Sequence, residues 1–369
     1  MSRAKDIARS LYHDAGRPMS LGCANCPERA VCGGLHTAGH FDCLVFCECP
    51  DRSDCQYVCR NNLENYIDRF HEVLGFEFDN IPRVPILTYP ALPPALPLLY
   101  HSSARTRRLK ADAVVVPLEN LLDLKTGMLR FDSRAAVAGY FGFDEGARLV
   151  ITGVAQDQPI EDYWSFRRET RIPEQLAALR PDLVTVPNYS TPLDTPRWDN
   201  LHNMKRIAIC WSELVSAGIP TSLHLNACTD RDWERWIEFV AARDEIRSVA
   251  FEYATGAARL ERGDWHTKKL AALAAAVPRP LQVVIRGGYV HLDQLYQAFS
   301  EVVFVDTTAF MKTMKRKRFM RRPDGKVYWA PAGIPMDRPL DALLDHNVRS
   351  CSGVISEVAI KRSRDPLRK

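Results

Sequence analysis

The sequence of 369 residues has no long apolar run and no strong excess of charge of either sign. No stretch reaches the roughly 20 consecutive apolar residues of a membrane-spanning helix, which argues against a bilayer protein. The first twenty residues carry charges throughout and lack the apolar core of a secretory signal, so we expect a cytoplasmic protein. Forty-nine Lys and Arg residues against 45 Asp and Glu residues leave a formal charge of +4, so a surface for an acidic partner must come from local clustering.

Cysteine is distributed unevenly along the chain. Eight of the eleven cysteines fall within 37 residues, at Cys23, Cys26, Cys32, Cys43, Cys47, Cys49, Cys55 and Cys59. In a reducing compartment such a block favours metal binding over disulfides, and eight thiolates suffice for two zinc sites or for iron–sulfur clusters. The C-x3-C-x2-C loop of radical S-adenosylmethionine enzymes is absent. We therefore expect a module that folds around zinc, with an iron–sulfur cluster as the alternative.

Composition divides the chain into three parts. Residues 1–80 form the predicted cysteine-rich metal-binding module, closed by an amphipathic helix over residues 60–74. Residues 81–110 form a proline-rich connector, because the six prolines over residues 82–97 are incompatible with helix interiors and central strands. Residues 111–369 form the third part, which carries a periodic pattern of apolar runs.

Short apolar runs alternate with helical patterns in this third part. The predicted strands are residues 113–117, 149–154, 183–186, 219–225, 246–253, 281–285, 302–305 and 353–360. Strands separated by helices indicate a parallel sheet, and eight units over about 250 residues match an α/β fold of the (β/α)8, TIM-like barrel type. No G-x-G-x-x-G follows any of these strands, which disfavours the alternative of a doubly wound open sheet.

In a barrel of this type the chemistry lies at the carboxyl ends of the strands. The polar or glycine residues found there are Asp157, Asn188, His224, Asn226, Glu252, Gly256, Arg286, Gly287 and Asp306. The carboxylates Asp157 and Asp306 follow different strands, which suits a nucleophile and a separate general acid/base. The alternative is that each aspartate caps the helix that follows its strand.

The order of these motifs resembles the barrel of the tRNA-guanine transglycosylases and of their DNA-modifying 7-deazapurine relatives. Residues 281–320 carry the resemblance, because a strand ending in Gly-rich sequence leads through a helix to a strand that closes with Asp306. The resemblance, over residues 149–320, implies that Asp306 is the nucleophile and Asp157 the acid/base. The base contacts that it implies are Asn188, His224, Asn226 and Gly256. The sequence departs from the family at Asn188, where an aspartate is expected, and in having no zinc site after the barrel.

A basic segment, residues 312–322, follows Asp306 and holds seven Lys and Arg residues. Beside a nucleophile it could hold the phosphates of a nucleic acid whose base is extruded into the site, although a solvated face is the alternative. The substrate-binding candidates outside the family pattern are Arg286, Gly287, Lys312, Arg316 and Arg318. We expect a glycosyl-transfer or base-exchange enzyme acting on tRNA or DNA. The alternatives are a catalytically idle metal-dependent nucleic-acid-binding protein and a barrel hydrolase of a small phosphorylated metabolite.

Overall fold

The computed structural model describes residues 63–191, 197–254 and 260–363. These residues form two compact units. The barrel unit comprises Val84–Asn188, Glu213–His224 and the chain from Arg243 onward, and the helical unit comprises residues 63–83 with Tyr189–Ser212 and Leu225–Ala242. Within the described ranges, no helix has the length and apolar character needed to cross a bilayer.

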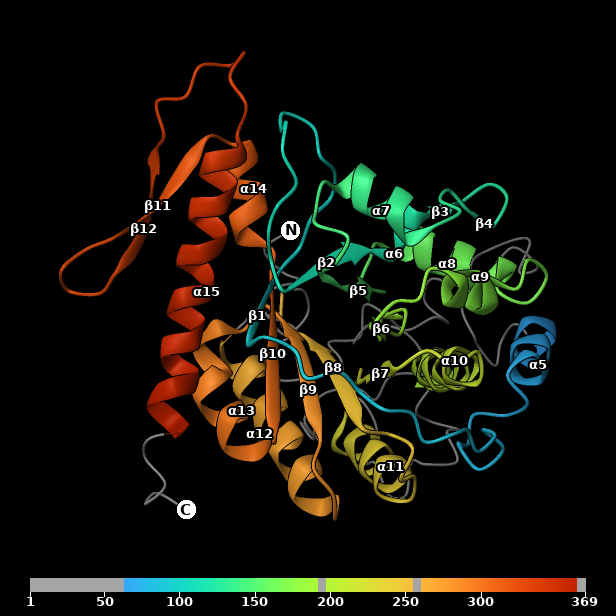
Figure 1. The fold of residues 1–369 in the computed structure, drawn as a ribbon. Coiled ribbons are helices and arrows are strands. Elements are labelled where there is room, and N and C mark those ends of the chain that lie inside the picture. The colour runs from blue at the N-terminus through green and yellow to red at the C-terminus, as the bar shows by residue number, and fades with distance from the viewer. Residues whose placement is uncertain (1–62, 192–196, 255–259, 364–369) are drawn as a thin grey trace, which may run out of the picture. The chain divides into compact units, whose positions relative to one another are not determined.

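Eight parallel strands follow one another in sequence order around a nearly closed barrel (Figure 1). The strands are β1 (Ala95–Pro97), β2 (Ala113–Pro117), β5 (Arg148–Thr152), β6 (Leu183–Thr185), β7 (Thr221–His224), β8 (Ser248–Glu252), β9 (Gln282–Arg286) and β10 (Glu301–Asp306). Strand β1 pairs with β10, and it meets β2 through a bridge between Leu98 and Val115. The α/β class and the TIM-like barrel predicted from the sequence are confirmed at this level.

Helices and two antiparallel hairpins occupy the connections between the strands. The helices are α5 (Leu63–Glu72), α6 (Leu118–Leu121), α7 (Arg134–Phe141), α8 (Asp157–Phe166), α9 (Ile172–Ala178), α10 (Arg197–Ser216), α11 (Asp230–Ala241), α12 (Leu260–Ala276), the 3-10 turn η1 (Tyr289–His291), α13 (Leu292–Ala298), α14 (Thr308–Met314) and α15 (Asp341–Ser363). The hairpins pair β3 (Leu122–Asp123) with β4 (Met128–Leu129) and β11 (Lys317–Arg321) with β12 (Val327–Pro331). The helix predicted over residues 60–74 corresponds to α5.

The barrel interior is filled by apolar side chains from alternate positions of the strands. This core consists of Leu96, Leu98, Ala113, Val115, Val150, Leu183, Ala250, Val284, Val303 and Val305. Because successive side chains of a strand point to opposite faces, membership of the core shows which residues of each strand face inward. We call the end of the barrel at which the strands finish the mouth. Only strand-end residues that face inward can reach it.

The strand predicted at residues 353–360 is wrong, because these residues belong to α15. The β-branched residues of this run favour a strand, but the buried residues of α15 recur at helical spacing. Leu344, Val348, Cys351 and Ile355 lie four, three and four residues apart, and all four are buried. A helix buries them on one face, whereas a strand could not.

The exclusion of a central strand from the proline-rich connector was also wrong, because β1 lies inside it. The N–H of Leu98 donates to Asp306 of β10, and the N–H of Leu99 donates to Val115 of β2. Successive N–H groups point to opposite neighbours, so the donor that Pro97 lacks would have faced β2. The proline is therefore tolerated, and β1 and β2 are joined by a single bridge.

The helical unit has an aromatic core between α11 and the segment that follows α5. Phe78 stacks on Trp236, with ring centroids 4.8 Å apart. The indole N–H of Trp236 donates to the backbone oxygen of Asn226 at 2.8 Å. Trp236 is fully buried, so this pair holds the segment after α5 against α11.

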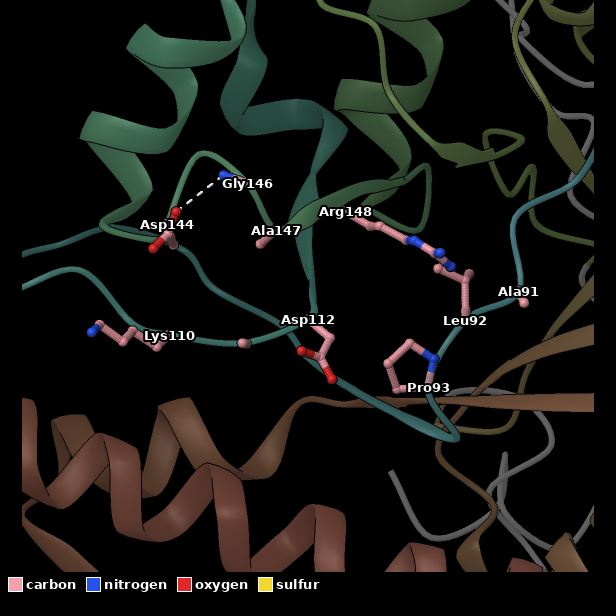
Figure 2. Close-up of a pocket in the computed structure, with 10 residues that line it drawn as sticks. Ala91, Leu92, Pro93, Lys110, Asp112, Asp144, Gly146, Ala147 and Arg148 are labelled. Atoms are coloured by element: carbon pink, nitrogen blue, oxygen red, sulfur yellow. Dashed lines mark hydrogen bonds between the residues drawn. The ribbon is translucent and has the colours of Figure 1, made fainter.

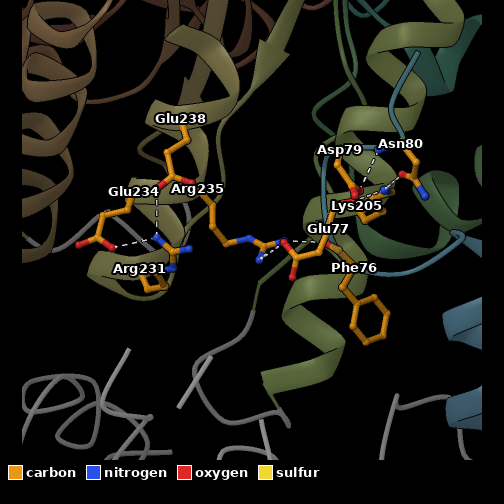
Figure 3. Close-up of polar contacts among 9 residues, drawn as sticks. All are labelled: Phe76, Glu77, Asp79, Asn80, Lys205, Arg231, Glu234, Arg235 and Glu238. Atoms are coloured by element: carbon orange, nitrogen blue, oxygen red, sulfur yellow. Dashed lines mark hydrogen bonds and ion pairs between the residues drawn. The ribbon is translucent and has the colours of Figure 1, made fainter. Parts of the chain in front are cut away.

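Buried cations anchor the same segment (Figure 3). Lys205 of α10 donates to the backbone oxygen of Glu77 and to the side-chain oxygen of Asn80. Arg235 of α11 forms an ion pair with the Glu77 carboxylate at 3.0 Å. Each buried positive charge thus has hydrogen-bonded partners, without which its burial would be strongly unfavourable.

Candidate active site at the barrel mouth

Three polar side chains point into the barrel at the carboxyl ends of the neighbouring strands β7, β8 and β9. Ala250 and Val284 belong to the core, so Glu252 and Arg286, two residues further along, face the same way. Glu252 and Arg286 are also direct partners in the register between β8 and β9. His224 pairs with Ala250 and therefore shares its face. These three side chains meet at the mouth.

Glu252, which is buried, forms an ion pair with the partly exposed Arg286. One carboxylate oxygen of Glu252 lies 3.4 Å from Nε of Arg286, and the other accepts the backbone N–H of Ala254 at 2.7 Å. Arg286 also donates to the backbone oxygen of Val154 at 3.2 Å. Burial raises the pKa of Glu252 to about 7, against the opposing effects of Arg286 and the Ala254 amide. A carboxyl group with this pKa can donate and accept a proton near neutral pH.

His224 is fully buried beside this pair. Within the part of the chain that the structure describes, neither of its ring nitrogens has a hydrogen-bond partner. Burial and the positive charge of Arg286 lower the pKa of His224 to about 3, so its ring is neutral at pH 7. Each unmet buried polar atom costs about 1–3 kcal/mol, and such sites often hold water or a polar ligand. A polar ligand or water bound at the mouth could therefore supply hydrogen-bond partners to the two ring nitrogens of His224.

Two further ionisable side chains follow the first two strands. Tyr100 packs against the barrel core, and its backbone oxygen accepts the side-chain amide of Asn120 at 3.1 Å. Burial raises the pKa of Tyr100 and of the half-buried Glu119, and the charge of Arg286 opposes the rise at both groups. We call the five residues the mouth cluster: Tyr100, Glu119, His224, Glu252 and Arg286.

The two glycines after β9 are required by close packing. Gly287 and Gly288 have φ angles of +74° and +70°, which disfavour any side chain. A Cβ atom at Gly288 would lie 2.5 Å from the ring of Tyr253. The chain can therefore turn directly above β8. The role of Gly287 in substrate binding, expected from the sequence, stays a prediction.

Asp306 ends β10 but faces away from the barrel interior. Val305 belongs to the core, so the next side chain points to the outer, helix-facing side of the sheet. Its Oδ1 accepts the N–H groups of Thr308 at 2.8 Å and Ala309 at 3.2 Å, and the thiol of Cys351 is hydrogen-bonded to the same carboxylate. Asp306 therefore caps α14, the alternative that the sequence left open. The nucleophile role implied by the family resemblance receives no support from this position.

Replacing Asp306 with alanine is expected to destabilise the protein by about 1–2 kcal/mol, because two amides at the start of α14 lose their acceptor. Asp306→Asn should cost less, since its amide oxygen can still accept from the Thr308 N–H. Thermal unfolding of both variants measures the difference. Equal stability of the wild type and Asp306→Ala would show that the cap is unimportant.

Two other predicted residues follow β5 and β6. Asp157 is an exposed first residue of α8, where its charge favours the helix N-terminus. Asn188 is half-buried, and its backbone N–H donates to Gly153 at 3.2 Å. Gly153 allows this approach, because a Cβ there would lie 2.5 Å from the backbone nitrogen of Pro187. Neither residue belongs to the mouth cluster.

The remaining base-contact candidates fall elsewhere. Asn226 belongs to the helical unit, where its side-chain amide donates to the backbone oxygen of Tyr189 at 2.6 Å. Gly256 lies outside the described residues.

The eight N-terminal cysteines also lie outside the described residues. Residues 63–191, 197–254 and 260–363 contain no group of three or more His, Cys, Asp or Glu side chains placed to bind a metal.

The basic segment forms the end of α14 and the strand β11. Lys312 lies on α14, with its ammonium nitrogen 5.9 Å from the ring of Trp329. Arg316 precedes β11 and donates to the backbone oxygen of Met336 at 2.7 Å. Arg318 lies on β11 and is exposed. The segment belongs to the connection that leaves the carboxyl end of β10.

An open depression of about 750 Å³ lies at the opposite end of the barrel, where β2 and β5 begin (Figure 2). Its charged lining is mixed, with Lys110 and Arg148 against Asp112 and Asp144. Barrel enzymes place their chemistry at the carboxyl ends of the strands. We therefore locate the candidate active site at the mouth and not in this depression.

Sequence reasoning found part of the mouth cluster. His224 and Arg286 were among the candidates, and Glu252 was recognised as a strand-end residue without being selected. Tyr100 and Glu119 were missed, because Tyr100 follows a strand that the prolines concealed and Glu119 lies within the short helix α6. The apolar run that ends at Pro117 marks the end of a strand, and Glu119 follows it by two residues, so the strand end could have indicated Glu119.

A scan against protein-family models and a search of curated proteins found no match to this chain.

Proposed function

We propose that this chain is a barrel enzyme that carries out glycosyl transfer by base exchange on a nucleic acid, with the mouth cluster as its active site. The observation that carries the proposal is the inward pair of Glu252 and Arg286 beside His224. Glycosyl transfer uses two carboxylates in separate roles, and Glu119 and Glu252 follow different strands. The proposal therefore replaces Asp306 and Asp157 as the reacting groups.

The exchange can be written with two carboxylates. The Glu119 carboxylate attacks C1′ of the target nucleoside, a C–O bond forms, and the base leaves with a proton from Glu252 as its glycosidic bond breaks. An incoming base then gives its proton to Glu252 and attacks C1′, and Glu119 departs as a carboxylate. A Glu252 pKa of about 7 suits both proton transfers at neutral pH. Arg286 stabilises negative charge on the carboxylates during the cycle.

Two features support a nucleic acid as the substrate. The basic segment supplies cations for phosphates within the last strand-to-helix connection of the barrel. The order of motifs over residues 149–320 also resembles that of tRNA-guanine transglycosylases and their DNA-modifying relatives. Under this proposal the target base leaves its stack and enters the mouth.

The test supplies labelled guanine or 7-deazaguanine together with tRNA or DNA and follows incorporation of the label. Wild type, Glu252→Gln and Asp306→Asn are compared. Incorporation that Glu252→Gln abolishes and Asp306→Asn retains supports the mouth cluster. The reverse result would restore Asp306 as the nucleophile. Salt-dependent nucleic-acid binding without incorporation favours an idle binding protein, and absence of both favours a hydrolase of a phosphorylated metabolite.

We also propose that the eight N-terminal cysteines bind zinc, with an iron–sulfur cluster as the alternative. Their number and close spacing support this proposal. Metal analysis and an absorption spectrum of anaerobically purified protein distinguish the two metals, because only an iron–sulfur cluster is brown. Metal-free protein with full activity would refute a required metal.

A further inference from the structure

The hairpin of β11 and β12 has two different faces. Lys317, Phe319 and Arg321 alternate along β11 with Arg318 and Met320, so the two sets point to opposite sides. Phe319 is buried, whereas Arg318 is exposed. We call the face that carries Arg318 the outer face; its residues are Arg318, Met320, Arg322, Tyr328 and Ala330.

The other face and the free edge of β11 are attached to α15 (Figure 1). The backbone N–H of Phe319 donates to the side chain of Asn347 at 2.8 Å, and His346 is hydrogen-bonded to the backbone oxygen of Phe319 at 3.0 Å. Arg321 makes two bonds to the carboxylate of Glu357, at 2.7 and 2.9 Å. The hairpin is therefore held along the helix, and its outer face is turned away from it.

A tight turn keeps the hairpin closed. The chain reverses at Pro323, Asp324 and Gly325, and the φ angle of Gly325 is +84°. The backbone N–H of Lys326 donates to the Asp324 side chain at 3.0 Å, and the N–H of Arg322 donates to the Lys326 oxygen at 2.9 Å. Proline, aspartate and glycine are the residues that such turns favour. The outer face is thus preformed.

The outer face combines cations with an accessible aromatic ring. Tyr328 is 40% exposed, and it lies directly across from Met320. The guanidinium of Arg322 lies 5.4 Å from the Tyr328 ring. Among the described residues, neither Arg318 nor Arg322 has an acidic partner. These two arginines are four residues apart, which corresponds to about 13 Å along a strand.

We propose that the outer face of the β11–β12 hairpin binds single-stranded nucleic acid, with a base stacked on Tyr328 and phosphates held by Arg318 and Arg322. An unpaired base offers the flat face that an aromatic ring needs for stacking, whereas a duplex buries it. Arginine pairs with phosphate through charge-assisted hydrogen bonds. This inference deepens the proposed function, because it names the strand form that the enzyme holds while a base is exchanged.

The test measures binding of labelled oligo-dT and oligo-U to the full-length protein by fluorescence anisotropy, with a duplex of equal length for comparison. Tyr328→Ala is expected to weaken strand binding about 5- to 150-fold, because base stacking contributes about 1–3 kcal/mol. Arg318→Ala/Arg322→Ala should flatten the dependence of log K on log salt by about 1.4, or about 0.7 for each lost phosphate contact. The matched control is Lys125→Ala/Arg130→Ala, which removes two exposed cations from the β3–β4 region and should bind as wild type does.

The inference is wrong if Tyr328→Ala and the double arginine variant bind the strands with wild-type affinity. It is also wrong if the duplex, or an acidic peptide of similar charge, binds as tightly as the strands. Circular dichroism spectra show whether each variant keeps its fold. Glu252→Gln separates this inference from the proposed function, because it should lose base exchange and keep strand binding. Unchanged exchange in Glu252→Gln, together with weakened binding in Tyr328→Ala, would refute the proposed function and support the hairpin surface.

Discussion

Replacing Glu252 with glutamine is expected to lower the rate of base exchange by about 10²- to 10⁴-fold, the usual contribution of a general acid/base. Glutamine keeps the size of the side chain, and its oxygen can still accept the Ala254 N–H. It cannot exchange a proton with the leaving or incoming base. The activity of the wild type should also depend on a group with a pKa of about 7. Glu252→Gln should lose that dependence, which the pH profile of kcat/KM measures.

The stability difference between Glu252→Gln and the wild type is also expected to depend on pH. The pKa of Glu252 is raised from 4.5 to about 7 by burial, so the folded protein binds its proton more tightly than the unfolded chain does. Stability contributed by the protonated carboxyl is fully present below pH 4.5 and is lost as the pH rises to about 7. The shift corresponds to about 3 kcal/mol. Glu252→Gln should therefore gain stability relative to the wild type as the pH rises from 4.5 to 7.

Thermal unfolding of both proteins across this range measures the effect. Glu145→Gln is the matched control, since it removes an exposed carboxylate at a loop position. A difference between Glu252→Gln and the wild type that stays constant from pH 4.5 to 8 would contradict a raised pKa at Glu252.

The barrel could be predicted because buried parallel strands are apolar on both faces and are separated by helices. Seven of the eight predicted ranges overlap a strand of the barrel. Two predictions failed: strand β1 was missed because it is short, and residues 353–360 were predicted as a strand although packing makes them helical. Strand β1 has only three residues and contains a proline, so no periodicity marks it. In residues 353–360 the preference of β-branched residues for strands conflicts with the helical spacing of α15, and packing decides for the helix.

Burial on both faces makes these strands easy to predict, but it also prevents a prediction of which way the residues at their ends point. A strand with both faces buried has no alternation of polar and apolar residues, so its parity is hidden. Strand β10 ends in Val303, Phe304, Val305 and Asp306, all of which are buried. A shift of one residue would move Asp306 from the helix side to the mouth. Local hydrogen bonds from the N–H groups of Thr308 and Ala309, together with a tertiary contact with Cys351 on α15, hold Asp306 on the helix side.

Replacing Trp236 with alanine is expected to destabilise the helical unit by about 3–5 kcal/mol, the usual cost of removing a fully buried tryptophan side chain. Its ring is fully buried and stacks on Phe78. Its N–H bond to the backbone oxygen of Asn226 is lost as well. Hydrogen exchange at residues 76–80 should accelerate strongly, because this segment loses the aromatic surface against which it packs. Urea unfolding followed by circular dichroism measures the loss of stability.

Trp236→Phe provides the matched control for this prediction. Phenylalanine keeps an aromatic ring against Phe78 but cannot donate to the Asn226 oxygen, so its cost should be smaller. The difference between the two variants separates ring packing from the hydrogen bond. If Trp236→Ala costs less than about 1 kcal/mol, or if exchange at residues 76–80 does not change, the stack between Phe78 and Trp236 does not hold this segment in place. In that case the buried cations Lys205 and Arg235 must carry the attachment through their bonds to Glu77 and its neighbours.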